Sequence, residues 1–151
     1  MAAEKKLEDG GGPVDVAVRA LRHRDRSRAD VAARLEKAGV GEAEREAALE
    51  TLERIGWVDD SRFAASRAEG LAARGRGDAL IRDDLVRSAV SSEAIGAALA
   101  SLEPEAERAR AIVAAKGRSA ATARYLARNG FSEESVEATV GAFAAGEDSA
   151  M

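Results

Sequence analysis

The stretch ARLEKAGVGEAEREAALETL (33–52) returns twice further along the chain, as DDLVRSAVSSEAIGAALASL (83–102) and RYLARNGFSEESVEATVGAF (124–143). The three copies carry apolar residues at the same three places when they are aligned without gaps. The matched sets are Leu35, Leu85 and Leu126, then Val40, Val90 and Phe131, then Leu49, Leu99 and Val140. Self-similarity at a spacing of about 40–50 residues is typical of proteins built from copies of one small helical unit.

Each copy predicts two helices joined by a tight turn. Gly39 and Gly130 fall where a helix ends in a left-handed residue, which glycine adopts without a steric penalty, and Ala89 holds that place in the middle copy. After the turn, mostly apolar residues recur at i, i+3, i+4 and i+7, which is the spacing of one helical face. These positions are Arg45, Ala48, Leu49 and Leu52; Ile95, Ala98, Leu99 and Leu102; and Val136, Thr139, Val140 and Phe143.

A further helix is expected before each copy, because apolar residues again recur at helical spacing. The three stripes are Val14, Ala17, Val18 and Leu21; Phe63, Ala64, Ala68 and Leu71; and Ala106, Ala109, Ile112 and Val113. Helix start signals support these boundaries. Ser27 with Asp30 resembles a capping box, Ser132 precedes two glutamates, and Pro104 fits the first position of a helix.

The sequence therefore predicts an all-α fold of three tandem three-helix repeats that stack into an elongated, curved array. The expected repeats span residues 14–58, 59–103 and 104–143, with flexible segments at 1–13 and 144–151. Such an array offers an extended binding surface, whereas enzymes usually need a deep convergent pocket. A binding protein is expected rather than an enzyme.

Composition narrows the class further. The chain has 151 residues, of which 36 are alanine, and it contains no cysteine, so disulfides and thiolate metal sites are excluded. Its single histidine, His23, makes a metal site improbable, and no cofactor motif is present. Residues 1–13 lack the apolar stretch of a signal peptide, and no apolar run is long enough to span a bilayer. We expect a cytoplasmic, monomeric protein without membrane contact.

Charge is unevenly distributed along the chain, although the net charge is only −4. Residues 42–60 hold seven acids and two arginines, whereas residues 108–128 hold six bases and no acid. The basic segment keeps open a direct nucleic-acid interaction for a chain of three-helix, helix-turn-helix-like units.

Three ordered segments resemble the signatures of the RecX family, the regulators of the RecA recombinase. They are RHRDRSRADVAARLEKAGV (22–40), WVDDSRFAASRAEGLAARGRGDALIRDDL (57–85) and RYLARNGFSEESV (124–136). The resemblance covers roughly residues 14–143. In this chain Asn129 stands where the family usually shows a basic residue.

The resemblance implies a regulator, an inhibitor in the family's usual account, that binds the RecA filament on single-stranded DNA. It would limit filament extension, ATP hydrolysis and strand exchange, and so act in DNA recombination, DNA repair and the SOS response without catalytic residues. Two other functions stay open: a direct DNA-binding protein, and a helical-repeat scaffold for another partner.

Nine arginines are the candidate partner-binding residues, three for each repeat. A planar guanidinium can pair with carboxylates or phosphates through two hydrogen bonds. We expect each triplet to lie at the start of the second helix of its repeat, so that basic patches line one side. The residues are Arg24, Arg26 and Arg28; Arg74, Arg76 and Arg82; and Arg118, Arg124 and Arg128.

Other prominent residues have structural interpretations. Asp59 and Asp60 followed by Phe63 suggest a helix cap and a core aromatic residue. Trp57 is expected to pack at the junction of the first two repeats, and Tyr125 and Phe131 are expected in the core. The tripeptide Arg76-Gly77-Asp78 spells a cell-adhesion motif, which we interpret as coincidence.

Overall fold

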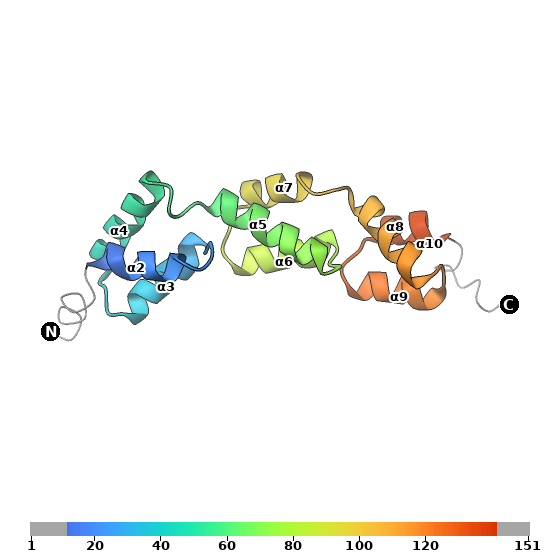
Figure 1. The fold of residues 1–151 in the computed structure, drawn as a ribbon, viewed down its shortest axis with the longest axis horizontal. Coiled ribbons are helices and arrows are strands. Elements are labelled where there is room, and N and C mark those ends of the chain that lie inside the picture. The colour runs from blue at the N-terminus through green and yellow to red at the C-terminus, as the bar shows by residue number, and fades with distance from the viewer. Residues whose placement is uncertain (1–11, 142–151) are drawn as a thin grey trace. The chain divides into compact units, whose positions relative to one another are not determined.

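The computed structural model describes residues 12–141, and every element in that part of the chain is an α-helix (Figure 1). The helices are α2 (Pro13–Leu21), α3 (Arg28–Lys37), α4 (Glu42–Arg54), α5 (Asp60–Ala73), α6 (Asp78–Arg87), α7 (Ser92–Ala100), α8 (Glu105–Lys116), α9 (Ala120–Arg128) and α10 (Glu133–Val140). The predicted all-α fold class is confirmed. Phe143 and the tail predicted at 144–151 lie outside the described residues, as does most of the segment 1–13.

Two compact units divide the chain. Unit 1 comprises the residues up to Ala64 together with Ser88–Val90, and unit 2 comprises Ala65–Arg87 together with the residues from Ser91 onward. The division falls within α5. The number and the bounds of the three expected repeats therefore stay a prediction.

Unit 1 is built on three helices, α2, α3 and α4, each of which packs against the other two (Figure 1). Its core contains only leucine, valine and alanine among the described residues: Ala17, Leu21, Val31, Leu35, Val40, Ala48, Leu49, Leu52 and Val58. Leu35 and Leu52 are fully buried, with 0% of their surface exposed. Burial of each such leucine contributes about 1.5–3 kcal/mol, so small aliphatic side chains suffice to hold this unit together.

Unit 2 contains a second helical triplet, in which α8, α9 and α10 pack against one another, and α6 packs against α7 (Figure 1). The core of the triplet consists of Ala109, Ala123, Leu126, Phe131, Val136 and Val140. Phe131 is buried, as predicted, and Tyr125 is half-buried against this core. The helix spacing in the sequence thus identified the buried faces.

The turns after α3, α6 and α9 share one backbone conformation. Gly39 and Gly130 have φ values of 90° and 89°, and Ala89 has a φ of 59°. After α3, the Val40 N–H donates to the Leu35 carbonyl at 3.0 Å, which satisfies a carbonyl at the helix end. The predicted left-handed glycines are confirmed, and Ala89 adopts the same conformation at a steric cost of about 1–2 kcal/mol.

Side-chain caps begin several helices. The Ser27 hydroxyl accepts a hydrogen bond from the Asp30 N–H at 3.1 Å, and the Ser132 hydroxyl does so from the Ser135 N–H at 3.1 Å. Both predicted starts are confirmed. The prediction for Pro104 is wrong by one residue: Pro104 has an extended ψ of 142° and precedes α8, whose first residue is Glu105.

Candidate partner-binding surface

Two turns of unit 2 are bonded directly through their backbones. They are the α5–α6 turn and the α9–α10 turn, where the Gly77 N–H donates to the Asn129 carbonyl at 2.7 Å and the Ala79 N–H donates to the Gly130 carbonyl at 3.2 Å. A Cβ added at Gly77 would lie 2.4 Å from the carbonyl carbon of Gly130. Only glycine allows the two turns to approach so closely.

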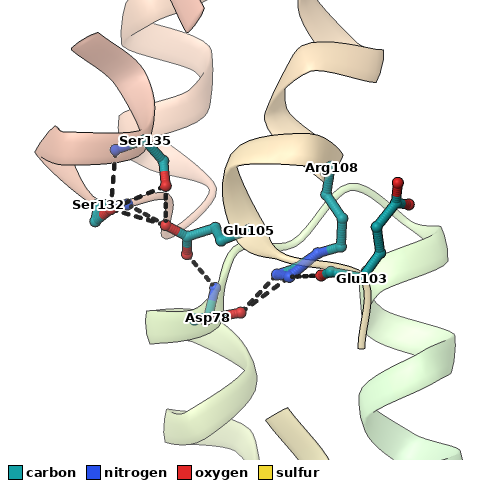
Figure 2. Close-up of polar contacts among 6 residues, drawn as sticks. All are labelled: Asp78, Glu103, Glu105, Arg108, Ser132 and Ser135. Carbon is teal, nitrogen blue, oxygen red and sulfur yellow. Dashed lines mark hydrogen bonds and ion pairs between the residues drawn. The ribbon is translucent and has the colours of Figure 1, made fainter. Parts of the chain in front are cut away.

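One carboxylate locks this contact, as Figure 2 shows. Glu105 Oε1 accepts hydrogen bonds from the Ser132 N–H at 3.0 Å, the Ser132 hydroxyl at 2.8 Å and the Ser135 hydroxyl at 2.7 Å. Glu105 Oε2 accepts from the Asp78 N–H at 2.8 Å. The carboxylate therefore satisfies N–H groups at the starts of both α6 and α10, where helix dipoles favour negative charge.

Burial and polar contacts have opposite effects on the pKa values of the two acids in this cluster, Glu105 and Asp78. Burial alone would raise the pKa of Glu105, but its hydrogen bonds from Ser135, Ser132 and the Asp78 N–H outweigh burial and lower the pKa below its ordinary value. Burial raises the pKa of Asp78, because it outweighs the opposing influence of the Arg108 guanidinium, and the Glu105 carboxylate adds to the rise. Glu105 is thus stabilised as a charged acceptor.

Arg108 completes the cluster from within α8 (Figure 2). Its two terminal nitrogens donate to Asp78 Oδ1 at 3.0 and 2.6 Å, and only 9% of its side chain is exposed. The guanidinium carbon lies 5.9 Å from the centre of the Phe131 ring. Arg108 belongs to the basic segment noted in the sequence, but its guanidinium is bonded to Asp78 inside unit 2.

Four of the nine candidate arginines lie on or beside the two joined turns. Arg74 and Arg76 are in the α5–α6 turn, Arg82 is in the second turn of α6, and Arg128 is the last residue of α9. Arg74, Arg82 and Arg128 are exposed, whereas Arg76 is half-buried and donates to Asn129 Oδ1 at 2.6 Å. We call Arg74, Arg82 and Arg128 the turn arginines.

The two remaining candidate arginines of unit 2, Arg118 and Arg124, lie before α9 and in its middle. The prediction that the third triplet occupies the start of this helix is wrong for Arg124 and Arg128, which occupy its middle and its end. The aligned block begins inside the corresponding helix in every copy, and Arg124 is the first residue of the third block. Arg118 precedes the helix, and its Nε donates to the Val140 carbonyl at 2.7 Å.

The first triplet is largely engaged inside unit 1. Arg26 Nε donates to the Ala20 carbonyl at 2.7 Å, and its guanidinium also pairs with Asp30 at 3.2 Å. Arg28 pairs with Glu53 at 2.9 Å and also with Glu46. Arg24 is exposed. In unit 1, therefore, two of the three candidate arginines are paired with acids, whereas three exposed arginines lie on or beside the joined turns of unit 2.

The structural roles of several residues were not identified from the sequence. Gly77 and Asp78 were interpreted as part of a coincidental tripeptide, yet both hold the joined turns. The interpretation of Trp57 as a packed residue is wrong, because 42% of its surface is exposed. The Asp59 cap is confirmed, since its Oδ1 accepts from the Arg62 N–H at 3.0 Å.

Among the described residues, no helix combines the length and the apolar character that crossing a membrane requires. The same residues contain no group of three or more acidic, histidine or cysteine side chains placed to hold a metal ion.

Comparison with known proteins finds relatives that share one name. The protein named Regulatory protein RecX from Xanthomonas axonopodis pv. citri (strain 306) is 35% identical over 136 residues, which cover 83% of this chain and 84% of that protein. The protein of the same name from Stenotrophomonas maltophilia (strain R551-3) is 34% identical over 136 residues, 82% of each chain. No family model matches the chain.

Solved structures share the fold. The crystal structure of RecX from Lactobacillus salivarius superposes with a TM-score of 0.75 at 15% identity, covering 94% of this chain and 99% of that one. A crystal structure of regulatory protein RecX superposes with a TM-score of 0.72 at 20% identity, covering 92% of this chain and 73% of that one.

Proposed function

Because the chain belongs to the RecX family of regulatory proteins, we propose that it binds the RecA filament on single-stranded DNA and limits filament extension, ATP hydrolysis and strand exchange. In this proposal it acts by binding and carries no catalytic residue. The names of its relatives as regulatory proteins support that view.

The joined turns of unit 2 are the observation that supports the proposal most. The turn arginines Arg74, Arg82 and Arg128 lie on two backbone segments. The hydrogen bonds from the Gly77 and Ala79 N–H groups join these segments to each other. Because the frame is fixed, little backbone entropy is lost when these side chains bind a partner. Their guanidinium groups suit carboxylates of a protein filament or phosphates of the DNA inside it.

Direct DNA binding receives less support from the contacts. The basic segment 108–128 is not a uniform exposed stripe, since Arg108 is buried against Asp78 and Arg110 pairs with Glu107. A gel shift with single-stranded DNA alone measures this alternative. A complex that forms without RecA and weakens steeply with salt would favour it.

The test of the proposal is RecA-dependent ATP hydrolysis on single-stranded DNA with increasing amounts of the chain. Wild-type protein is expected to lower hydrolysis and strand exchange. Charge reversal of the three turn arginines to glutamate is expected to weaken this inhibition at least about tenfold, because arginine is enriched among the interface residues whose truncation costs about 2 kcal/mol or more.

A matched triple variant controls for the change in net charge. Lys37, Arg87 and Arg110 are exposed basic residues outside the candidate set, and their reversal to glutamate adds the same charge. Inhibition is expected to change little in this control. Full inhibition by the charge-reversal variant of the turn arginines would contradict their role in binding. Unchanged hydrolysis with an excess of wild-type chain would contradict the proposed function itself.

A further inference from the structure

The turn between α4 and α5 exposes two large apolar side chains of unit 1. Ile55 is 53% exposed and Trp57 is 42% exposed, and only Gly56 separates them in the sequence. Exposed tryptophan next to exposed isoleucine is unfavourable in water, and such clustered apolar surface marks interaction sites.

Hydrogen bonds to the end of α4 fix the backbone of this turn. The Leu52 carbonyl accepts hydrogen bonds from the Trp57 N–H at 2.9 Å and from the Val58 N–H at 3.1 Å. Val58 is buried in the core of unit 1, and Gly56 adopts the left-handed conformation with a φ of 82°. The turn is therefore a defined structure rather than a loose connection.

Arg62 holds the same turn from the other side. Its terminal nitrogens donate to the carbonyls of Gly56 at 2.9 Å and Trp57 at 3.2 Å. Its Nε donates to both carboxylate oxygens of Asp25 at 3.1 Å. Ile55 and Trp57 thus extend from a turn whose backbone is held by these hydrogen bonds, so a partner need not order that backbone on binding.

The charge around the pair indicates the chemistry of its partner. Four acids, Glu50, Glu53, Asp59 and Asp60, lie within five positions of the pair in the sequence, against the two bases Arg54 and Arg62. Arg62 is already paired with Asp25, and Arg28 pairs with Glu53. This acidic setting repels the phosphates of nucleic acids and anionic lipids. It complements a protein surface with an apolar pocket and a basic rim, where tryptophan is a frequent binding hot spot.

We propose that Ile55 and Trp57 form a docking knob that inserts into an apolar, basic-rimmed pocket on the partner protein. The inference rests on the proposed function and deepens it, because the RecA filament is that partner. It assigns unit 1 a contact that is separate in chemistry from the turn arginines of unit 2.

Binding of the full chain to RecA filaments on single-stranded DNA tests the knob. A fluorescent dye on the chain reports affinity by anisotropy, for wild type and for the variant Ile55→Ser with Trp57→Ala. We expect the variant to bind about tenfold more weakly or worse. Val86→Ser is the matched control, because Val86 is an isolated exposed apolar residue of α6, 59% exposed, and this variant is expected to bind within twofold of wild type.

A second readout follows Trp57 itself, the only tryptophan of the chain. The chain is prepared with 5-hydroxytryptophan, which is excited at wavelengths where the tryptophans of a partner do not absorb. Quenching by acrylamide is expected to fall when filaments are added and to stay unchanged with single-stranded DNA alone.

The outcomes separate the two proposals. Wild-type binding with an equally tight double variant, or unchanged quenching in the filament complex, overturns the knob and leaves the proposed function standing. Protection by DNA alone, or concentration-dependent self-association that the double variant abolishes, assigns the knob to another partner and overturns the inference. No binding by wild-type chain overturns both. Circular dichroism verifies that each variant keeps its helices.

Discussion

Units 1 and 2 each contain a helix whose first residue is an acid that bonds to the start of an earlier helix. In unit 1, Asp60 at the start of α5 accepts from the Arg28 N–H at 2.7 Å. In unit 2, Glu105 at the start of α8 accepts from the Asp78 N–H at 2.8 Å. Both acids satisfy an N–H group that a helix start leaves without an intrahelical partner. We call these contacts the unit 1 joint and the unit 2 joint.

The joints differ in the side chains around them. The longer side chain of Glu105 also accepts from Ser132 and Ser135, so the unit 2 joint gathers three helices (Figure 2). The residues that donate the N–H groups are opposite in charge, Arg28 in one joint and Asp78 in the other. Equivalent places in this chain therefore share a backbone contact without sharing charge. A basic residue at one joint therefore need not have a basic counterpart at the other.

The largest expected effect comes from forcing apart the backbone contact beside the unit 2 joint. Gly77→Ala places a Cβ within 2.4–2.5 Å of backbone atoms of Gly130 and Phe131, which cannot move as a flexible side chain could. We expect a loss of about 2–3 kcal/mol in the free energy of unfolding, as in other overpacked sites. The shift of the urea unfolding midpoint measures it.

Gly41→Ala is the control in unit 1. A Cβ at Gly41 meets nothing within 4 Å, so only a small change is expected. Equal losses in the two variants would show that the close approach at Gly77 is not what makes the unit 2 joint rigid.

The second effect compares the acids themselves. Glu105→Gln removes the charge and places an amide NH₂ against at least one of the N–H and O–H donors that Glu105 now accepts. We expect a loss of about 1–3 kcal/mol, because a hydrogen bond to a charged group is lost and a donor is left unsatisfied. Asp60→Asn, in the joint with fewer donors, is expected to cost less. Amide hydrogen exchange at Asp78 and Arg28 measures each joint, and a larger effect at Arg28 would reverse the ranking.

The sequence predicted those features of both units that depend on short-range patterns. Helix spacing identified Ala48, Leu49 and Leu52, all buried, and the glycine positions identified two left-handed turns. Serine caps followed from residue type alone. These features depend on neighbours within a few positions of the chain.

The joints themselves were beyond the sequence, because their partners lie about 30 residues apart. Asp78 and Glu105 differ by 27 positions, and Arg28 and Asp60 by 32, with nothing in a local window to pair them. The arginine set shows the same limit. Arg28 and Arg74 were both expected in basic patches, but only the contacts reveal that Arg28 pairs with two glutamates while Arg74 is exposed.

A smaller effect concerns the pH dependence of the unit 2 joint. Since the pKa of folded Glu105 is lowered, its stabilisation is present above the unfolded value of about 4.3 and is lost as pH falls through the lowered folded value. The difference in unfolding free energy between wild type and Glu105→Gln is therefore expected to shrink below about pH 4.3. Thermal unfolding of both proteins from pH 6 to pH 3 measures it. A difference that grows on acidification would contradict the lowered pKa.

The smallest expected effect asks whether the arginine side chain matters to the unit 1 joint at all. Arg28→Ala removes two ion pairs, with Glu46 and Glu53, but keeps the backbone N–H that Asp60 accepts. The side chain is 31% exposed and both glutamates are more exposed still, so solvent screens the pairs and about 0–1 kcal/mol is expected in urea unfolding. Amide exchange at position 28 should stay nearly as slow as in wild type. If it instead became as fast as in Asp60→Asn, the ion pairs rather than the backbone contact would hold this joint, and the likeness between the two units would be one of geometry without shared energetics.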